Sequence, residues 1–181
     1  MELTCIVGLV SGKEVLIGGD SAGVSRLDLI VRSDSKVFRN GPFVIGFTTS
    51  FRMGQLLAHS FTPPVRRTDQ DVYAFMVTDF VNEVRACLKN GGYAVRVNEA
   101  EKGGDFLVAY EGRLFVISSD YQVGENMDGI AACGCGAQIA LGAMFATPKV
   151  NPKERVILAL QAAENFSAGV RGPFLIVSSK E

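Results

Sequence analysis

The chain has 181 residues, of which 48% are apolar, so one domain with a substantial core is expected. Its 18 Lys and Arg residues nearly balance its 19 Asp and Glu residues and are spread along the sequence, which argues against a nucleic-acid partner. The N-terminal apolar run breaks at residues 11–13, too early for a secretory signal, and no later run is long enough to span a bilayer.

The N-terminal half of the chain is rich in apolar, β-branched runs, which predict strands. The expected strands are 4–10 paired with 14–17, 27–31 paired with 36–38, and a buried strand at 43–47. A short helix is predicted over 51–59. Thr68 and Asp71 are typical of a capped helix start, and apolar side chains then recur every four residues until Gly91 ends the helix: Val72, Met76, Phe80, Val84 and Leu88.

The C-terminal half predicts a hairpin, then helices, then a last strand. The hairpin strands are 106–110 and 113–118, both apolar enough to be covered on two faces. A strand at 130–133 leads through glycines into an Ala-rich helix that ends near Thr147, and Asn151 with Pro152 starts a helix to about Phe166. A strand at 173–177 follows. Antiparallel pairs with helices grouped between them indicate an α+β fold.

Cysteine and histidine usage excludes several kinds of site. The spacing of Cys5, Cys87, Cys133 and Cys135 fits neither a disulfide framework nor a zinc site, so a reduced, cytoplasmic protein without metal or cofactor is expected. His59 is the only histidine and is expected to be structural, at a helix end. A hydrolase built on this chain would therefore use another group as its base.

Three polar residues at fixed intervals carry a family resemblance. Thr4, with the stretch 4–9, Asp20 after two glycines, and Lys36 resemble the start of proteasome β subunits and their bacterial HslV relatives, which are N-terminal nucleophile hydrolases. Further segments resemble that family in the same order: residues 46–49 its oxyanion loop, 134–136 its Gly-Ser-Gly turn, and 164–169 its Asp-x-x-Ser-Gly-Gly segment. The resemblance implies a four-layer αββα sandwich over a single domain, 1–181, with 1–3 as a short propeptide.

The resemblance also implies roles for individual residues. Thr4 would be the nucleophile, and its own α-amine, which titrates near 7.7 to 8.0 in model peptides, would be the base once Thr4 is the first residue. Lys36 would disfavour protonation of that amine and stabilise alkoxide character, and Asp20 would hold Lys36. The amide of Thr49 would donate to the oxyanion. Three further residues would orient the amine: Cys135, Glu164 and Ser167. Phe47 and Thr48 would line the substrate site, with Phe47 preferred to Phe51.

The sequence departs from the family pattern at several of these positions. Met1 to Leu3 precede Thr4, so a base exists only if the bond between Leu3 and Thr4 is cleaved. Thr49 replaces glycine, Cys135 replaces serine and Glu164 replaces aspartate. Structural interpretations stay open for them: Thr49 as a helix cap, Cys135 as packing, and Glu164 as an acid on a helix face.

The expected function is a threonine-type peptidase that assembles into a homo-oligomeric ring and receives unfolded protein from an ATP-driven AAA+ unfoldase. Neither nucleic acid nor membrane is an expected partner. A catalytically silent ring scaffold that is never processed, and an amide hydrolase of the same superfamily acting on small molecules, are the alternatives.

Overall fold

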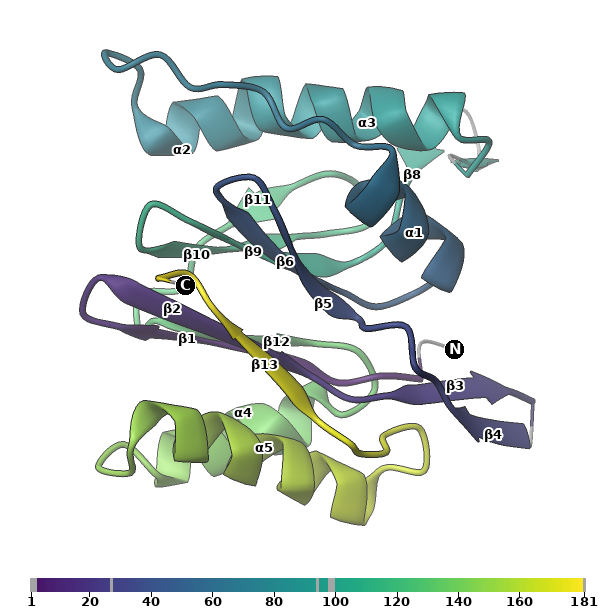
Figure 1. The fold of residues 1–181 in the computed structure, drawn as a ribbon, viewed down its shortest axis with the longest axis vertical. Coiled ribbons are helices and arrows are strands. Elements are labelled where there is room, and N and C mark those ends of the chain that lie inside the picture. The colour runs from purple at the N-terminus through teal and green to yellow at the C-terminus, as the bar shows by residue number, and fades with distance from the viewer. Residues whose placement is uncertain (1–2, 27, 94, 98–99, 181) are drawn as a thin grey trace.

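Stacked β-sheets form the centre of the molecule and helices cover both outer faces, which gives layers in the order helix, sheet, sheet, helix (Figure 1). The structure is a computed structural model and describes residues 3–26, 28–93, 95–97 and 100–180. This is the α+β fold that the sequence pattern predicts, in the four-layer arrangement that the family resemblance implies.

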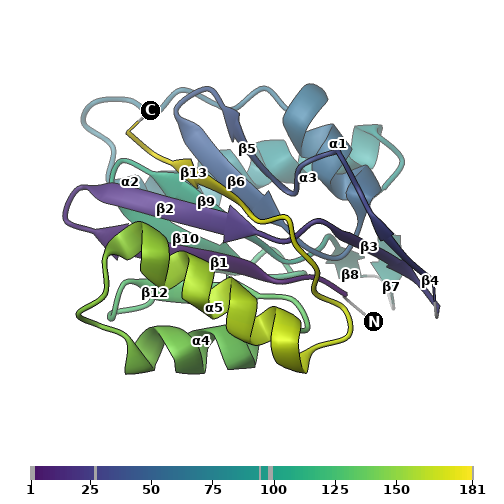
Figure 2. The ribbon, with the colours of Figure 1, turned by 60° about the horizontal axis from the view of Figure 1, so that its bottom comes forward.

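The lower sheet of Figure 1 is antiparallel and has four strands in the described part of the chain. Its order is β12 (Ile130–Cys133), β1 (Ile6–Ser11), β2 (Glu14–Gly19) and β13 (Leu175–Ser178). Helices α4 (Ala137–Ala146) and α5 (Pro152–Phe166) lie side by side across its outer face (Figure 2). Asn151 caps α5, as predicted, by accepting a hydrogen bond from the backbone N–H of Lys153.

The upper sheet has five strands among the described residues. Its order is β11 (Val123–Gly124), β10 (Arg113–Ile117), β9 (Phe106–Tyr110), β6 (Phe43–Phe47) and β5 (Val37–Asn40). The covering layer contains α1 (Phe51–His59) and a continuous helical rod made of α2 (Val72–Phe75), the π-helical segment η1 (Met76–Phe80) and α3 (Val81–Asn90).

The π-helical segment explains the spacing of four in the sequence. In a regular α-helix of 3.6 residues per turn, side chains four apart drift steadily around the axis. Hydrogen bonds from i to i+5 widen the turn over η1 and reduce this drift. Met76, Phe80, Val84 and Leu88 accordingly all face the sheet and are fully buried.

One predicted strand pairing is wrong. The segment 28–31 forms β4 (Asp28–Val31) and pairs with β3 (Ala22–Ser25) in a separate hairpin, whereas β5 pairs with β6. The predicted strand start at Leu27 lies outside the described residues. A further hairpin of β7 (Val95–Val97) and β8 (Ala100–Lys102), and the short strand β11, had no predicted counterpart.

Two glycines in the strands allow the sheets to approach closely. A Cβ on Gly46 would lie 2.6 Å from Ile6 Cγ2, and one on Gly8 would lie 2.7 Å from Leu114 Cδ1, both shorter than atoms tolerate. The space is filled instead by aliphatic side chains from both sheets: Ile6, Val15, Ile17, Val37, Val44, Leu107, Ala109 and Leu114.

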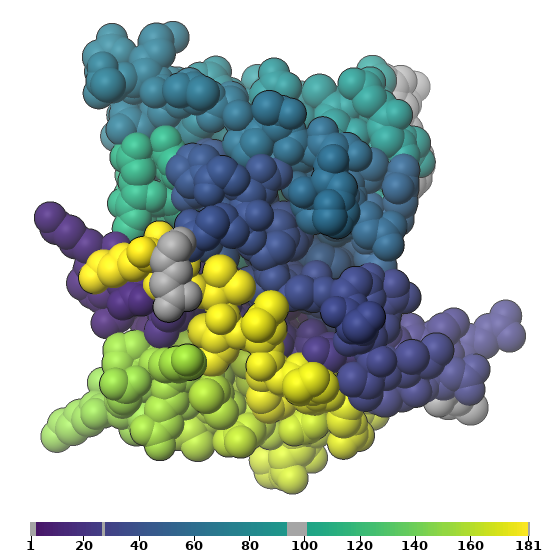
Figure 3. All heavy atoms as spheres, in the orientation of Figure 1, coloured from purple at the N-terminus to yellow at the C-terminus, as the bar shows by residue number. Residues whose placement is uncertain are grey.

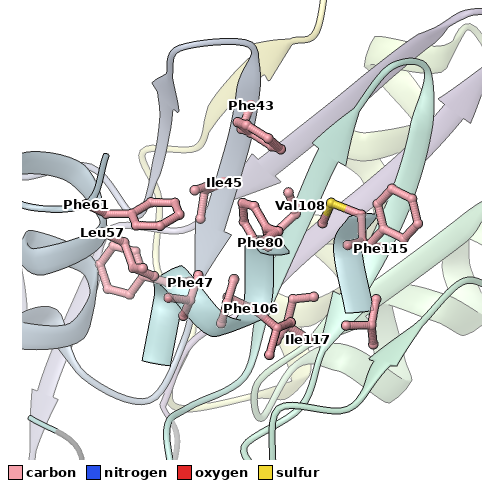
Figure 4. Packing of buried hydrophobic residues seen from close by; sticks show 14 of the residues in the cluster. Phe43, Ile45, Phe47, Leu57, Phe61, Phe80, Phe106, Val108, Phe115 and Ile117 are labelled. Atoms are coloured by element: carbon pink, nitrogen blue, oxygen red, sulfur yellow. The ribbon is translucent and has the colours of Figure 1, made fainter. Parts of the chain in front are cut away.

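Aromatic side chains dominate the packing between the upper sheet and its helices (Figure 4). Phe43 is fully buried, stacks on Tyr110 with ring centroids 4.3 Å apart, and lies 4.9 Å from the ring of Phe80. Such pairs contribute about 0.5–1.5 kcal/mol beyond the area that they bury. The β6 strand that leads to the candidate site is therefore held by aromatic contacts on its outer face.

We predict that Phe43→Ala lowers the free energy of unfolding by about 3–5 kcal/mol, because it leaves a cavity under the helical layer. Phe145→Ala is the matched control, since Phe145 is 80% exposed on α4, and should change stability by no more than about 0.5 kcal/mol. Urea denaturation followed by circular dichroism measures both. Equal stability of the two variants would contradict this description of the core.

Candidate active site

Strand register brings Thr4 and Asp20 to one end of the lower sheet. Ile6 of β1 pairs with Gly19 of β2, so the residues just before β1 and just after β2 are neighbours. Lys36 precedes β5 in the upper sheet, and its side chain reaches the same point. All three side chains are almost completely buried, with exposed fractions of 5% for Thr4, 2% for Asp20 and 2% for Lys36.

A short chain of polar contacts joins the three. The Lys36 ammonium donates a hydrogen bond to the Thr4 hydroxyl and another, of 2.9 Å, to Asp20 Oδ1, with which it forms an ion pair. A buried ammonium is stable only when it is paired and hydrogen-bonded, so Asp20 is the counter-charge that keeps Lys36 in place. The arrangement therefore places a positively charged ammonium in hydrogen-bond contact with a threonine hydroxyl.

Backbone amides complete the surroundings of the Asp20 carboxylate. Its Oδ1 accepts from the backbone N–H of Cys5 at 3.0 Å, and its Oδ2 from those of Ala22 at 2.9 Å and Arg171 at 3.3 Å. These donors come from three separate segments of the chain. Sequence reasoning missed them because a backbone donor carries no residue-type signal.

Burial and charge alter the titration of the groups near Thr4. Burial lowers the pKa of the Lys36 ammonium, and the neighbouring Asp20 carboxylate opposes that shift. Burial also raises the pKa of the Cys5 thiol to about 12, with the Asp20 charge adding to the effect. Cys5 is therefore a neutral thiol at physiological pH.

The turn between β12 and α4 holds the backbone of Thr4. Gly134 has φ +95°, and a Cβ there would lie 2.3 Å from the Thr4 carbonyl oxygen, so glycine is required on two grounds. That oxygen accepts from the backbone N–H of Gly136 at 3.3 Å and from the Cys135 thiol at 3.4 Å. Cys135 Sγ also lies 3.2 Å from Ser167 Oγ, so of the predicted orienting groups Cys135 contacts Thr4 and Ser167 contacts Cys135.

Leu3 packs against the same turn region. A Cβ on Gly169 would come within 2.7 Å of Leu3 Cδ2 and 2.8 Å of Cys135 Sγ, so these groups are in close contact around Gly169. Leu3 also lines the cavity in front of Thr4. The residue that precedes the candidate nucleophile therefore occupies part of the candidate site.

Glu164 has its contacts elsewhere. Its Oε1 accepts from the backbone N–H of Gly172 at 2.9 Å and lies 3.9 Å from the Arg171 guanidinium. Because the backbone N–H of Arg171 donates to Asp20, Glu164 is connected to the site through this loop. Its expected role in orienting the amine of Thr4 stays a prediction.

The expected oxyanion loop has an unusual backbone at Thr49. Its φ is +66°, a conformation that β-branched residues rarely adopt and that costs of order 1–3 kcal/mol. Contacts with Asp105 hold it: the Asp105 N–H donates to Thr49 Oγ1 at 3.1 Å, and Thr48 Oγ1 donates to the Asp105 carbonyl at 2.8 Å. A glycine at this position would adopt the same conformation without strain.

Two adjoining cavities lie beside this loop. The smaller, of about 80 Å³, is lined by Thr4, Lys36 and the segment 47–51. The larger, of about 260 Å³, lies against α1 and is lined in part by Asp34, Phe38 and His59. Phe47 and Phe51 line both cavities, so the cavity lining does not distinguish between them, and the preference for Phe47 in the substrate site stays a prediction.

Within the described residues, no cluster of three or more His, Cys, Asp or Glu side chains could hold a metal ion. None of the helices found there has the length and apolar character needed to cross a membrane. All four cysteines are described, and no disulfide joins them.

Comparisons with known proteins give related sequences and folds. No protein-family model matches the chain. The ATP-dependent protease subunit HslV of Caldicellulosiruptor saccharolyticus is 28% identical over 164 residues, which cover 89% of this chain and 88% of that protein. The structure of Thiobacillus denitrificans BPH in complex with epoxomicin has a TM-score of 0.79 at 22% identity, covering 96% of this chain and 97% of that one. The structure of HslV from Trypanosoma brucei has a TM-score of 0.68 at 18% identity, and the match covers 96% of this chain and 98% of that one.

We predict that Asp20→Ala destabilises the protein by about 3–5 kcal/mol, because it leaves the Lys36 ammonium buried without a counter-charge. Adding Lys36→Met should recover part of that loss, because the uncompensated charge is then removed. Denaturant unfolding of the two single variants and the double variant measures the coupling. A double variant whose destabilisation equals the sum of the two single ones would contradict a coupled pair.

We predict that iodoacetamide at pH 8 alkylates Cys135 well before Cys5 in the native protein. Cys135 is exposed, whereas Cys5 is fully buried, and a thiol with a pKa of about 12 is ionised to about one part in 10⁴ at that pH. Peptide mass mapping over time gives the order of labelling. Labelling of Cys5 at the rate of Cys135, without denaturant, would contradict the described burial.

Proposed function

We propose that this chain, which its fold and its curated relative assign to the HslV-like N-terminal nucleophile hydrolases, is a threonine-type peptidase. The proposal takes residues 1–181 as one proteasome-β-like domain and 1–3 as a propeptide that cleavage of the bond between Leu3 and Thr4 removes. The observation that carries it is the buried contact of the Thr4 hydroxyl with the Lys36 ammonium, which is itself paired with Asp20, at the edge of a cavity.

In the proposed reaction the Thr4 hydroxyl attacks the carbonyl carbon of a peptide bond. Its proton passes to the free α-amine of the same residue, which then delivers it to the leaving amine of the substrate. Lys36 stays protonated, stabilises negative charge on the Thr4 oxygen, and disfavours protonation of the neighbouring amine. Water then hydrolyses the ester and regenerates the hydroxyl.

The surrounding residues support the remaining steps. The positive φ of Thr49 sets the direction of the loop whose amide would stabilise the oxyanion. Cys135 contacts the backbone carbonyl of Thr4 and Ser167 contacts Cys135, and the two would orient the amine of Thr4 after cleavage. Phe47 and Thr48 line the cavity beside Thr4 and would contact the substrate.

Assembly and partners belong to the same proposal. We place the active sites inside a homo-oligomeric cytoplasmic ring that takes in unfolded polypeptide. The curated relative is an ATP-dependent protease subunit, which supports an AAA+ unfoldase as the partner of this chain.

A catalytically silent ring scaffold is the second candidate. It is favoured by the packing of Leu3 against Gly169 beside Cys135, since this contact would stabilise an uncleaved leader. In that state the nitrogen of Thr4 is an amide and cannot act as the base.

If the proposal is correct, the purified wild-type protein loses Met1 to Leu3 and cleaves fluorogenic peptides. Thr4→Ala should keep the full-length mass and lower kcat/KM at least about 10³-fold, because both the nucleophile and its cleavage reaction are lost. Thr4→Ser, which keeps a hydroxyl, should still be processed. Intact mass spectrometry and peptide turnover measure these outcomes.

The control is Thr62→Ala at an exposed threonine of the loop after α1, which should change neither property. A wild-type protein that forms rings but stays full length and inert would support the scaffold. Turnover of small acyl amides without turnover of peptides would instead support the small-molecule hydrolase.

A further inference from the structure

The segment that joins β4 to β5 lies at the surface of the molecule, below α1 in the view of Figure 3. It carries Arg32 and Asp34, whose side chains form an ion pair through two hydrogen bonds of 2.7 Å, from Nε to Oδ1 and from Nη2 to Oδ2. One guanidinium therefore binds both oxygens of the carboxylate. These hydrogen bonds hold the pKa of Asp34 below its usual value, so the carboxylate is charged at neutral pH.

The same guanidinium covers the ring of Phe51. Arg32 Cζ lies 3.9 Å from the Phe51 ring centroid, and the ring of Phe47 packs edge-on against that of Phe51 at 5.9 Å. The backbone N–H of Arg32 donates to the Ser21 carbonyl at 2.9 Å, and a Cβ on Gly23 would lie 2.7 Å from Arg32 Cδ. Arg32 is thus held at its backbone and along its side chain, and it fixes a ring that lines both cavities of the candidate site.

The cavity against α1 is large enough for a bulky substrate side chain, whereas the space in front of Thr4 is not. Their volumes are about 260 Å³ and about 80 Å³, and an apolar cavity of about 150 Å³ can hold benzene. In a peptide, the side chain of the residue whose carbonyl is attacked begins two bonds from the attacked carbon. With that carbon at the Thr4 hydroxyl, this side chain can extend past Phe47 and Phe51 into the larger cavity.

The larger cavity offers no free counter-charge to a basic side chain. Its lining contains three aromatic rings, those of Phe38, Phe47 and Phe51. Asp34 is the one acidic residue among the described residues that line it, and Arg32 already neutralises that charge. The Lys36 ammonium, 5.6 Å from the Phe51 ring centroid, adds a second cation nearby. A basic side chain would lose its hydration here without gaining a partner, while an uncharged one would not.

We propose that Arg32 determines the side-chain preference of the site by keeping the Asp34 carboxylate paired, so that the cavity against α1 accepts a large uncharged side chain of the substrate and disfavours a basic one. This role rests on the peptidase activity proposed above and defines the substrate class of that activity. Arg32 is a positioning residue, since it acts through Asp34 and Phe51. Its removal leaves a free carboxylate beside aromatic rings, which is a site for a basic side chain.

The test compares three fluorogenic peptides that differ only in the residue before the scissile bond, which is leucine, arginine or citrulline. Citrulline has nearly the shape of arginine and no charge, so the ratio of kcat/KM for the arginine peptide to that for the citrulline peptide reports charge. We expect wild type to prefer both uncharged peptides to the arginine peptide by at least about tenfold. Arg32→Ala should raise the ratio at least about tenfold, mainly through KM.

Two further variants make the result specific. Arg32→Ala combined with Asp34→Asn removes the freed charge and should return the ratio to within about threefold of wild type. Arg113→Ala is the matched control, because Arg113 on β10 also pairs with a carboxylate, that of Glu125, and lies 5.1 Å from the ring of Phe115. It should leave the ratio unchanged. The Arg32 and Asp34 side chains are 38% and 42% exposed, so the variants are expected to fold, which circular dichroism checks.

A ratio that stays at the wild-type value in Arg32→Ala, or that stays raised in the double variant, would overturn this role of Arg32 and leave the peptidase proposal intact. A wild-type protein that cleaves none of the three peptides would overturn the peptidase proposal, and the ratio is then measured as dissociation constants by calorimetric titration of the uncleaved peptides. Arginine binding that strengthens relative to citrulline binding in Arg32→Ala alone would then support the role of Arg32, and equal ratios in all variants would overturn it.

Discussion

The ion pair of Lys36 and Asp20 is the interaction on which the rest of the candidate site depends. A lysine that is 2% exposed remains charged only with a fixed counter-ion, and Asp20 is fixed in turn by backbone amides of Cys5, Ala22 and Arg171. The pair joins both sheets and the loop after α5. Thr4 receives its positive neighbour from this network, so the same contacts that join the layers also set up the chemistry.

Much of the fold could be predicted from the sequence because its strands and helices carry strong local patterns. The buried runs of β6 and β9 and the capped start of α5 are examples. The wrong pairing involved β4, whose apolar residues are exposed and so carry no information about which strand covers them. The π-helical segment η1 could not be predicted either, since spacings of four also occur in regular helices.

The residues of the candidate site could be predicted from the sequence where the type of side chain determines the chemistry. Contacts that depend on the path of the backbone could not be predicted. Thr4, Asp20 and Lys36 lie together as the resemblance implied, Cys135 contacts the Thr4 carbonyl, and Ser167 contacts Cys135. The contacts of Glu164 with the loop at Gly172, and of Arg32 with the ring of Phe51, depend on loop paths that no local pattern encodes. The catalytic roles of the predicted site residues remain part of the proposal.

Covalent trapping tests most directly the central claim, that Lys36 activates Thr4 once cleavage has made it the N-terminal residue. The purified protein would be incubated with a peptide β-lactone, whose strained carbonyl acylates an activated hydroxyl, and the adduct located by peptide mass mapping. The account predicts one acyl group on a chain that begins at Thr4, and none in Lys36→Met. An adduct confined to Cys135, or acylation of Lys36→Met at the wild-type rate, would contradict it.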